Sequence, residues 1–455
     1  MFLGVPRSMI VRLGWTSAGY GGVQGIRLIN NVVLARLLTP SIFGLMALIT
    51  TIRTGVELLS DLGIRQNIVS NPGGADPKFY NTAWTLQVLR GLLLAIICLA
   101  LAVPAAHFFR HPELASALSV APIFFIFTGF DSAARGLVQK EMNIARMSML
   151  EVINVFVAFI AQVLLAIITP TIWALIIGGI IGAASTLVTS YLLMPGLRHD
   201  FVIDRDSARQ LFKFGKWVFL SSIVYFLAMN FDRLYFAKQI TLSQLGIYGI
   251  ARSLADMVSL FVLRASSTVL YPTVAAAGLE RAALRQKLLR GRRTLLLGAA
   301  AALGAFAASS QSIVNLLYDP RYSEAGLILP ILCVGVWFGI LSSTSDSILM
   351  GLSRPAYPAL SNAAKLVTYV VGVPLAFYFY GFIAAVAAIS FGEIVKYGVL
   401  WAFSHKEHLH FGRDDFLLSL MFAATVVLTG EVLRTLGFGS GVEGLFSHLV
   451  TTIAG

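Results

Sequence analysis

The chain has 455 residues, of which 57% are hydrophobic and only 12% are charged, and its mean hydropathy is +0.80. A soluble protein carries about 25% charged residues, so this composition excludes an ordinary soluble domain. The net charge of +12 could indicate nucleic-acid binding, but the basic residues gather in alternate loops between apolar runs, as they do in membrane proteins.

Apolar runs of about 20 residues, the length that crosses a bilayer, follow one another along the whole chain. They predict spans at 12–35, 41–64, 81–105, 114–136, 147–168, 171–195, 213–236, 243–270, 294–316, 325–350, 356–379, 381–403 and 416–435. A last apolar piece, 441–454, is short and contains Glu443 and His448, so it is either a further span or an interfacial segment. No small-residue cleavage site follows the first run, which predicts an uncleaved first span.

Lysine and arginine are distributed unequally between the two sides of these spans. One side holds most of them, including Arg292, Arg354 and Lys365, whereas the loops of the other side hold only Arg36, Arg110, Lys238 and Arg321. The positive-inside rule then predicts a cytoplasmic N-terminus and a cytoplasmic loop at 196–212. The basic run 281–293 is predicted to be an amphipathic helix that contacts anionic lipids at the cytoplasmic surface.

Two short stretches recur in the two halves of the chain. Residues 34–46, LARLLTPSIFGLM, return as residues 236–248, FAKQITLSQLGIY, and in both copies a threonine, Thr39 or Thr241, is placed to cap the following helix. DSAARGL (131–137) and DSILMGL (346–352) also match, each at the inner end of the fourth span of its half. An even number of spans per half predicts parallel repeats, which is a transporter arrangement.

The predicted fold is therefore an all-α polytopic membrane protein. It has two six-helix bundles related by a pseudo-two-fold axis along the membrane normal, plus one or two extra C-terminal helices, or 13–14 spans in total. The predicted parts are an N-terminal bundle at 1–196, a cytoplasmic linker at 197–212, a C-terminal bundle at 213–404 and the extra helices at 405–455.

Several arginines lie deep within the predicted spans, where an isolated charge costs about 2.5–3.5 kcal/mol. They are Arg27, Arg53, Arg90 and Arg252. In one interpretation they line a water-filled cavity between the halves and bind a diphosphate, because the planar guanidinium group binds phosphate oxygens bidentately. In the other they are paired internally, with Arg53–Glu57 and Arg252–Asp256 as i, i+4 ion pairs.

The acidic residues of the spans leave similar alternatives open. Glu57, Asp256 and Asp61 are candidates for ion coupling or for pairing, and Asp61 could also cap its helix. Asp232 and Arg233, near the outer end of the seventh span, form either a gate contact or a simple ion pair. Asp131 and Asp346 are expected to fix helix ends or turns.

Other chemistry is not indicated by the sequence. Cys98 and Cys333 lie inside apolar runs and are predicted to be small buried side chains, neither a disulfide nor a metal site. The histidine-rich loop SHKEHLH (404–410) is predicted to face solvent and lipid headgroups, so we expect no metal and no cofactor. The sequence lacks a Walker lysine motif and a long outside loop for catalytic groups, which favours a transporter over an enzyme.

Five stretches carry a family resemblance: LARLLTPSIFG, DLGIRQNIVSN, FYNTAWTLQVLRG, HFFRHPELASAL and LVQKEMNIARMSMLEV. They resemble the polysaccharide transporters of the MOP flippase superfamily, the Wzx-type exporters of lipid-linked oligosaccharides. The resemblance implies two bundles around a V-shaped cavity. It also implies that an undecaprenyl-diphosphate-linked repeat unit is flipped from the inner to the outer leaflet of the bacterial cytoplasmic membrane by alternating access, for exopolysaccharide, O-antigen or capsule assembly.

In the related lipid II flippases, arginines on the first, second and eighth helices gather the substrate diphosphate. The resemblance carries this role to Arg27, Arg53 and Arg252. The implied partners are the lipid-linked oligosaccharide, membrane lipids and other polysaccharide-assembly membrane proteins, and no nucleic acid.

Two other functions stay open at this point. A multidrug or cation exporter of the MATE type, from the same superfamily, predicts a cavity dominated by acidic residues. A membrane polysaccharide polymerase or ligase requires a sizeable outside loop, and the predicted topology provides none.

Overall fold

A computed structural model describes residues 7–58, 63–140, 144–194, 197–266, 281–352, 356–409 and 411–436, together with the isolated positions 270, 274 and 354. All regular structure in these residues is helical, which confirms the predicted all-α class. The chain folds as two compact units, Met1–Phe226 and Leu227–Gly455. The predicted four-part division stays a prediction, and the last apolar piece, 441–454, lies outside the described residues.

Seven described helices are long and apolar enough to cross a membrane, and two bent helix pairs raise this number to nine if each pair is one span. Three further helices coincide with predicted spans and are as long, but they are more polar: α1 (Arg7–Leu37), α10 (Arg205–Gln239) and α11 (Leu242–Ala265). Their polar residues include Arg27, Asp232 and Arg252, because these helices carry several of the deep charges.

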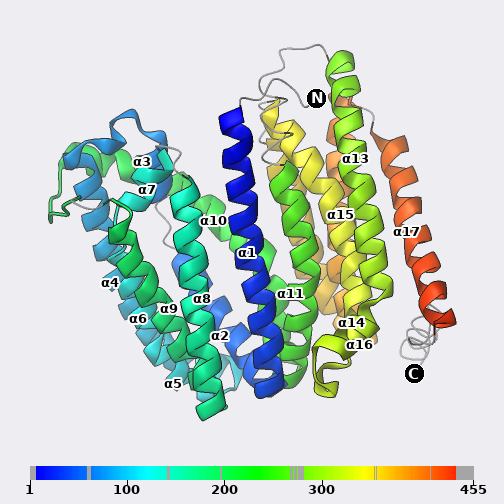
Figure 1. Ribbon diagram of the computed structural model, residues 1–455, viewed down its shortest axis with the longest axis horizontal. Coiled ribbons are helices and arrows are strands. Elements are labelled where there is room, and N and C mark those ends of the chain that lie inside the picture. Colours follow the sequence, from blue (N-terminus) through cyan, green and yellow to red (C-terminus); the bar gives the residue numbers. More distant parts are fainter. Residues whose placement is uncertain are drawn as a thin grey trace. The chain divides into compact units, whose positions relative to one another are not determined.

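The first unit begins with α1 and continues through a series of helices shown from blue to green in Figure 1. They are α2 (Pro40–Leu58), α3 (Ile64–Ser70), η1 (Pro72–Ala75), α4 (Pro77–Phe109), α5 (Glu113–Val120), α6 (Pro122–Gly129), α7 (Ala134–Lys140), α8 (Ile144–Ile168) and α9 (Ile172–Leu192). Helix α8 packs against α1 and α9, and α4 packs against α5 and α6. Leu34 of α1 and Leu38, just after its end, are buried with Ala166, Ala174 and Leu175 where α1, α8 and α9 meet.

The repeated sequence forms the same helix–turn–helix in both units. Helix α1 ends at Leu37 and α2 begins at Pro40, while α10 ends at Gln239 and α11 begins at Leu242. The two turns therefore occupy equivalent positions of the repeat. In the second copy Thr241 forms a capping box with Gln244, which satisfies backbone donors at the helix start.

The predicted fourth span, 114–136, is not one helix. It consists of α5 and α6, followed by a break and then α7, with a bend of 51° between Glu113–Gly129 and Ala134–Lys140. Asp131 lies in this break, as predicted for a residue that fixes a helix end. Its counterpart in the sequence match, Asp346, lies inside the continuous helix α15, so the two copies of this match differ in conformation.

The second unit contains the end of α10 and the helices α11, α13 (Arg281–Ala308), α14 (Ser310–Leu317), η3 (Pro320–Tyr322), α15 (Ala325–Gly351), α16 (Ala356–Lys406) and α17 (Gly412–Thr435). Helix α15 packs against α11, α13 and α16, and α17 packs against α13 (Figure 1). The predicted surface helix at 281–293 is continuous with the following span, because α13 runs from Arg281 to Ala308.

Helix α16 is a helical hairpin that turns at Gly381. This residue has φ 77° and ψ −165°, a conformation that only glycine adopts readily. The two arms meet along their length, because Tyr357 stacks on Phe403 at 4.2 Å and Lys365 pairs with Glu393. The predicted spans 356–379 and 381–403 are these two arms.

Candidate functional site

One polar cavity lies within the first unit and has a volume of about 510 Å³. We call it the Arg53 pocket. Its lining comes from helices α1, α2, α5, α6, α7, α8 and α9 and includes three arginines and two carboxylates. These charged residues are Arg27, Arg53, Arg135, Asp131 and Glu151. The pocket thus has one more cation than anions when all five side chains are ionised.

Arg53 is positioned by an aromatic ring on the facing wall. Its guanidinium carbon lies 4.6 Å from the centroid of the Phe124 ring, which is a cation–π contact from α2 to α6. Arg27 of α1 is exposed into the same cavity. Among the described residues neither arginine forms a salt bridge, so both guanidinium groups can bind an anion in the pocket.

The remaining polar lining consists mainly of amides and hydroxyls. Asn30 Nδ2 donates to Gln162 Oε1 at 2.8 Å, while Asn30 Oδ1 is buried and has no hydrogen-bond partner among the described residues. Two turns before Gln162 on α8, Asn154 Nδ2 donates to Thr189 Oγ1 at 2.8 Å. A buried acceptor without a partner is costly, so Asn30 Oδ1 is suited to accept a hydrogen bond from a hydroxyl of a ligand.

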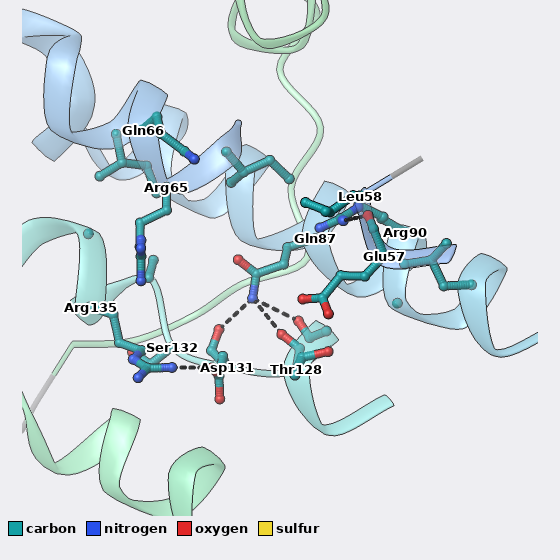
Figure 2. A pocket seen from close by; sticks show the side chains of 17 residues that line it. Glu57, Leu58, Arg65, Gln66, Gln87, Arg90, Thr128, Asp131, Ser132 and Arg135 are labelled. Carbon is teal, nitrogen blue, oxygen red and sulfur yellow. Dashed lines mark hydrogen bonds and ion pairs between the residues drawn. The ribbon is translucent and has the colours of Figure 1, made fainter. Parts of the chain in front are cut away.

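The smaller cavity, of about 310 Å³, lies among α2, α3, α4, α6 and α7 of the same unit. We call it the Arg90 pocket. It also contains three arginines, Arg65, Arg90 and Arg135, and two carboxylates, Glu57 and Asp131. Figure 2 shows Arg65 and Arg135 on one side of the pocket and Arg90 beside Glu57 on the other.

Two side chains of α4, Gln87 and Arg90, bind backbone carbonyl groups at the wall of this pocket. Gln87 Nε2 donates to the backbone carbonyls of Thr128, Gly129 and Asp131 at 3.0, 3.2 and 3.0 Å, as the dashed lines in Figure 2 show. Thr128 and Gly129 end α6 and Asp131 lies in the break that follows, where the last carbonyls of a helix lack the usual i+4 partners. Arg90 Nη2 donates to the backbone carbonyl of Glu57 at 2.6 Å.

The two pockets share one charged wall. Thr128, Asp131 and Arg135 line both of them. Arg135 Nη1 donates to Asp131 Oδ2 at 2.8 Å, and the two side chains are 30% and 12% exposed. Asp131 also lies close enough to Arg65 to interact with its charge.

The segment that follows α9 packs against the α6–α7 break. His199 Nε2 accepts from the backbone N–H of Ala133 at 3.1 Å and lies 3.2 Å from Ser132 Oγ. Further along, the N–H groups of Asp200, Val202 and Asp204 donate to Asn81, Thr85 and Thr82 of α4 at 3.2, 3.1 and 3.0 Å. The segment is therefore fixed along one face of α4.

His199 is surrounded by aromatic side chains, and its burial lowers the pKa of the imidazole. The rings of Trp84 and Tyr191 lie 5.1 and 5.2 Å from it, centroid to centroid. A neutral imidazole can keep Nε2 as an acceptor, which agrees with the hydrogen bond from Ala133.

In the second unit, the predicted site residue Arg252 is held by two acids. Its Nε lies 3.2 Å from Asp256, which confirms the predicted i, i+4 ion pair, and its Nη1 lies 3.7 Å from Asp232. Asp232 is buried and also accepts from the hydroxyl of Tyr248. Asp232 Oδ1 also accepts a hydrogen bond from the backbone N–H of Arg233 at 2.8 Å. This contact does not test a gate role, so the gate role of Asp232 and Arg233 stays a prediction.

Further ion pairs of this unit include two cations, Lys365 and Arg292, that the sequence analysis assigned to cytoplasmic loops. Lys365 is 1% exposed and pairs with Glu393, while Lys396 lies 3.0 Å from Asp346. Arg292, also 1% exposed, binds Asp415 through both terminal nitrogens and donates to Thr344 Oγ1 at 3.1 Å. The loop assignment of Lys365 and Arg292 was therefore wrong, because both residues lie within helices, α16 and α13, and their buried side chains pair with acidic residues.

The predicted diphosphate-binding residues are thus divided among three places. Arg27 and Arg53 line the Arg53 pocket, Arg90 lines the Arg90 pocket with Glu57, and Arg252 belongs to the second unit. Asp61 lies outside the described residues. Arg135 was missed as a site residue because it was counted as a loop charge, although its i, i+4 spacing from Asp131 was visible in the sequence.

An all-helical membrane protein with charged cavities between its helices belongs to the class of polytopic transporters, and comparisons identify its family. Residues 33–327 match the family described as polysaccharide biosynthesis protein, so the chain belongs to that family. This confirms the resemblance to the Wzx-type polysaccharide transporters.

The curated relatives are distant but match over most of their length. The lipopolysaccharide biosynthesis protein WzxC of Escherichia coli K12 is 23% identical over 79% of this chain and 73% of its own. The succinoglycan biosynthesis transport protein ExoT of Rhizobium meliloti is 24% identical over 76% of this chain and 69% of its own.

Two solved structures share the fold. An inward closed form of the lipid II flippase MurJ has a TM-score of 0.73 at 14% identity and covers 92% of this chain and 99% of its own. An inward-facing MATE multidrug transporter of the MOP superfamily has a TM-score of 0.65 at 13% identity, over 87% of this chain and 94% of its own. These likenesses confirm the predicted fold class.

Proposed function

We propose that the protein is a flippase that moves undecaprenyl-diphosphate-linked oligosaccharide repeat units from the inner to the outer leaflet of the bacterial cytoplasmic membrane. The names of its relatives, which refer to lipopolysaccharide biosynthesis and succinoglycan transport, support this proposal. The N-terminus lies in the cytoplasm, in agreement with the positive-inside pattern, and the chain performs transport without catalysing a chemical reaction.

The observation that carries the proposal is the charge of the Arg53 pocket. A membrane-embedded cavity with three arginines and two carboxylates favours an anionic ligand over a cationic one. Arg27 and Arg53 would bind the diphosphate, because guanidinium groups form bidentate, charge-assisted hydrogen bonds with phosphate oxygens.

The rest of the lining suits the other parts of such a substrate. Asn30, Asn154 and Gln162 provide amide groups that can hydrogen-bond sugar hydroxyls. The polyprenyl tail would stay in the surrounding lipid, since its transfer into a polar cavity would lose hydrophobic free energy. Alternating access would then expose the polar group to each side of the membrane in turn.

The test combines a deletion with substitutions of Arg53. In the producing bacterium, loss of the gene should block polysaccharide export and cause lipid-linked repeat units to accumulate on the inner leaflet. Arg53→Gln should reduce export at least about tenfold, since a charge-assisted hydrogen bond is lost, whereas Arg53→Lys should retain part of it. Arg209→Gln, which changes an exposed arginine of α10, is the matched control.

Each result of this test has a defined meaning. Normal export from the deletion strain would overturn the flippase function. Normal export from an Arg27→Gln, Arg53→Gln double variant, with wild-type protein levels in the membrane, would overturn the role of these arginines while leaving the function in place.

A cation exporter of the MATE type is the second candidate, because a MATE transporter shares the fold. It would require a cavity that attracts organic cations, and the excess of arginine in the Arg53 pocket opposes this. Efflux of an organic cation that depends on this protein in membrane vesicles would favour the exporter over the flippase.

A further inference from the structure

We propose that the Arg90 pocket is a second binding position for the phosphate groups of the ligand, and that Arg135 transfers these groups between the Arg90 and Arg53 pockets. The inference rests on the proposed function for the identity of the ligand. Of the three arginines of this pocket only Arg90 belonged to the predicted diphosphate-binding residues, and the proposal adds Arg65 and assigns a role to Arg135.

Arg135 lies on the wall that the two pockets share. Both pockets lie in the first unit, and Arg135 is the third arginine of each. Without it, each pocket would contain two arginines and two carboxylates. The excess of positive charge in both cavities therefore depends on one side chain, and an anion in either pocket is attracted toward the same point.

Arg135 has N–H donors that its ion pair with Asp131 does not use. A guanidinium group has five N–H donors in a planar fork, and Asp131 is contacted at 2.8 Å by only one terminal nitrogen. The remaining donors can bind phosphate oxygens while the ion pair is intact. Since Asp131 also interacts with the charge of Arg65, it keeps a cationic neighbour when Arg135 turns toward a phosphate.

The backbone just before Arg135 is bound by two side chains, Gln87 and His199. Gln87 binds the carbonyls of Thr128, Gly129 and Asp131, and His199 accepts from the N–H of Ala133. Arg135 follows directly after this fixed segment, in the first turn of α7. A side chain that serves two cavities benefits from such a rigid support, because only its own torsions need to change.

The positions of the arginines around the Arg90 pocket indicate the class of ligand (Figure 2). Arg65 and Arg135 lie on one side of the Arg90 pocket and Arg90 on the other, so an oxyanion can contact guanidinium groups from two directions. This chemistry fits the diphosphate of a lipid-linked substrate, and a phospholipid headgroup would present similar phosphate oxygens. The experiment below distinguishes the two sources.

The test measures binding of radiolabelled inorganic diphosphate to the purified full-length chain in neutral detergent. The wild type should show two sites. Arg65→Gln should weaken one of them at least about tenfold, and the Arg27→Gln, Arg53→Gln double variant should weaken the other, because each change removes charge-assisted hydrogen bonds from one pocket. Arg65 is exposed, so its replacement should not disturb folding, and Arg209→Gln is again the matched control.

Arg135→Gln should weaken both sites together, whereas Arg135→Lys should weaken both less. Because Arg135→Gln leaves Asp131 without its partner, the double variant Asp131→Asn, Arg135→Gln is measured beside it as a pair without an unbalanced charge. It keeps the excess of one positive charge in each pocket and should melt at the wild-type temperature, but it should still bind more weakly at both sites because the N–H donors of Arg135 are lost.

The results that overturn the inference differ from those that overturn the flippase function. A single site in the wild type, or an effect of the Asp131→Asn, Arg135→Gln variant on one site only, would overturn the transfer role even if export depends on the protein. Displacement of diphosphate from the Arg65-dependent site by micromolar phosphatidylglycerol, without any effect of undecaprenyl diphosphate, would identify a lipid-headgroup site and also overturn it.

Discussion

Lys365 and Glu393, which are 28 residues apart in the sequence, form a buried ion pair between the two arms of the α16 hairpin. Lys365 is 1% exposed, and its ammonium group also lies 5.2 Å from the centroid of the Tyr369 ring. Two facing arms of a helical hairpin thus meet through a pair of opposite charges.

Replacement of one partner should therefore destabilise the protein strongly. Lys365→Met leaves the carboxylate of Glu393 buried without its cation and should lower the free energy of unfolding by about 3–5 kcal/mol. The double variant Lys365→Met, Glu393→Met should recover most of this loss, because no unpaired charge remains. Thermal unfolding in detergent, followed by circular dichroism, measures both changes.

An exposed ion pair provides the control for this prediction. Arg321 and Asp319 lie 2.9 Å apart but are 42% and 34% exposed, so Arg321→Met should cost less than about 1 kcal/mol. Equal destabilisation by Arg321→Met and Lys365→Met would show that burial of the Lys365–Glu393 pair has no special weight.

The turn of the same hairpin gives a second prediction. Gly381 has φ 77° and ψ −165°, and a Cβ atom added there would meet no other atom within 4 Å. Gly381→Ala should thus destabilise the protein by about 1–3 kcal/mol through backbone strain alone. Gly398→Ala is the matched control, because Gly398 lies in the helical part of α16, also in open space, where alanine should be neutral or stabilising by up to about 1 kcal/mol.

The sequence predicted the helices and their turns well where the signal is local. The turns at 38–39 and 240–241 were found from a repeated pattern of basic residue, threonine and glycine, and the helices end and begin at equivalent residues of the repeat. The hairpin turn was placed at 380, next to Gly381, because the apolar runs are interrupted there. Such features depend on neighbours in sequence, which a single chain displays directly.

The sequence did not predict which charges share a cavity. Arg53 and Glu57 are one helical turn apart, yet they line different pockets, because the other walls come from different helices: α1, α5, α8 and α9 around Arg53, and α3 and α4 around Glu57. The break after Gly129 borders both pockets, and Gln87, from a distant part of the chain, binds the carbonyls of Thr128, Gly129 and Asp131 there. Lys365 was misplaced for a similar reason, since its partner Glu393 lies 28 residues away.

His199 provides a prediction about pH, because the burial of its imidazole lowers its pKa below the ordinary value of about 6.5. The unfolded chain therefore binds a proton at a higher pH than the folded chain does. The stabilisation from neutral His199 is complete above about pH 6.5 and is lost as the pH falls toward the lowered folded pKa. Protonation would also turn Nε2 into a donor and break the bond from the Ala133 N–H.

Hydrogen exchange measures this effect at the amide of Ala133. After correction for the intrinsic rate, protection should be lower at pH 5 than at pH 7.5 in the wild type. His199→Gln keeps a hydrogen-bonding side chain that does not titrate, so the difference between the two pH values should shrink. His107→Gln, which changes an exposed histidine on α4, should leave the pH difference as in the wild type. An unchanged pH difference in His199→Gln would assign the effect to other groups near the linker, such as Asp200.

The last prediction concerns the contact between α4 and α6 at the Arg90 pocket. Gly91 and Gly129 both line this pocket, and a Cβ atom on Gly91 would lie 2.6 Å from the carbonyl oxygen of Phe125 and 2.8 Å from the Cα of Gly129. Both obstacles are backbone atoms, so they cannot turn away as a side chain could. Gly91→Ala should therefore separate the two helices locally and destabilise the protein by about 1–3 kcal/mol.

The same substitution should affect the pocket more than the rest of the unit. Because Gln87 lies one turn before Gly91 on α4, a shift of this helix would lengthen the hydrogen bonds from Gln87 to Thr128, Gly129 and Asp131. We expect the Arg65-dependent diphosphate site to weaken, while the site that depends on Arg27 and Arg53 changes less. Gly249→Ala, at a helical glycine of α11 with no atom within 4 Å of the added Cβ, should change neither the melting temperature nor diphosphate binding. A Gly91→Ala protein that melts and binds like the wild type would show that α4 and α6 can separate at this point without cost, contrary to the tight backbone contact.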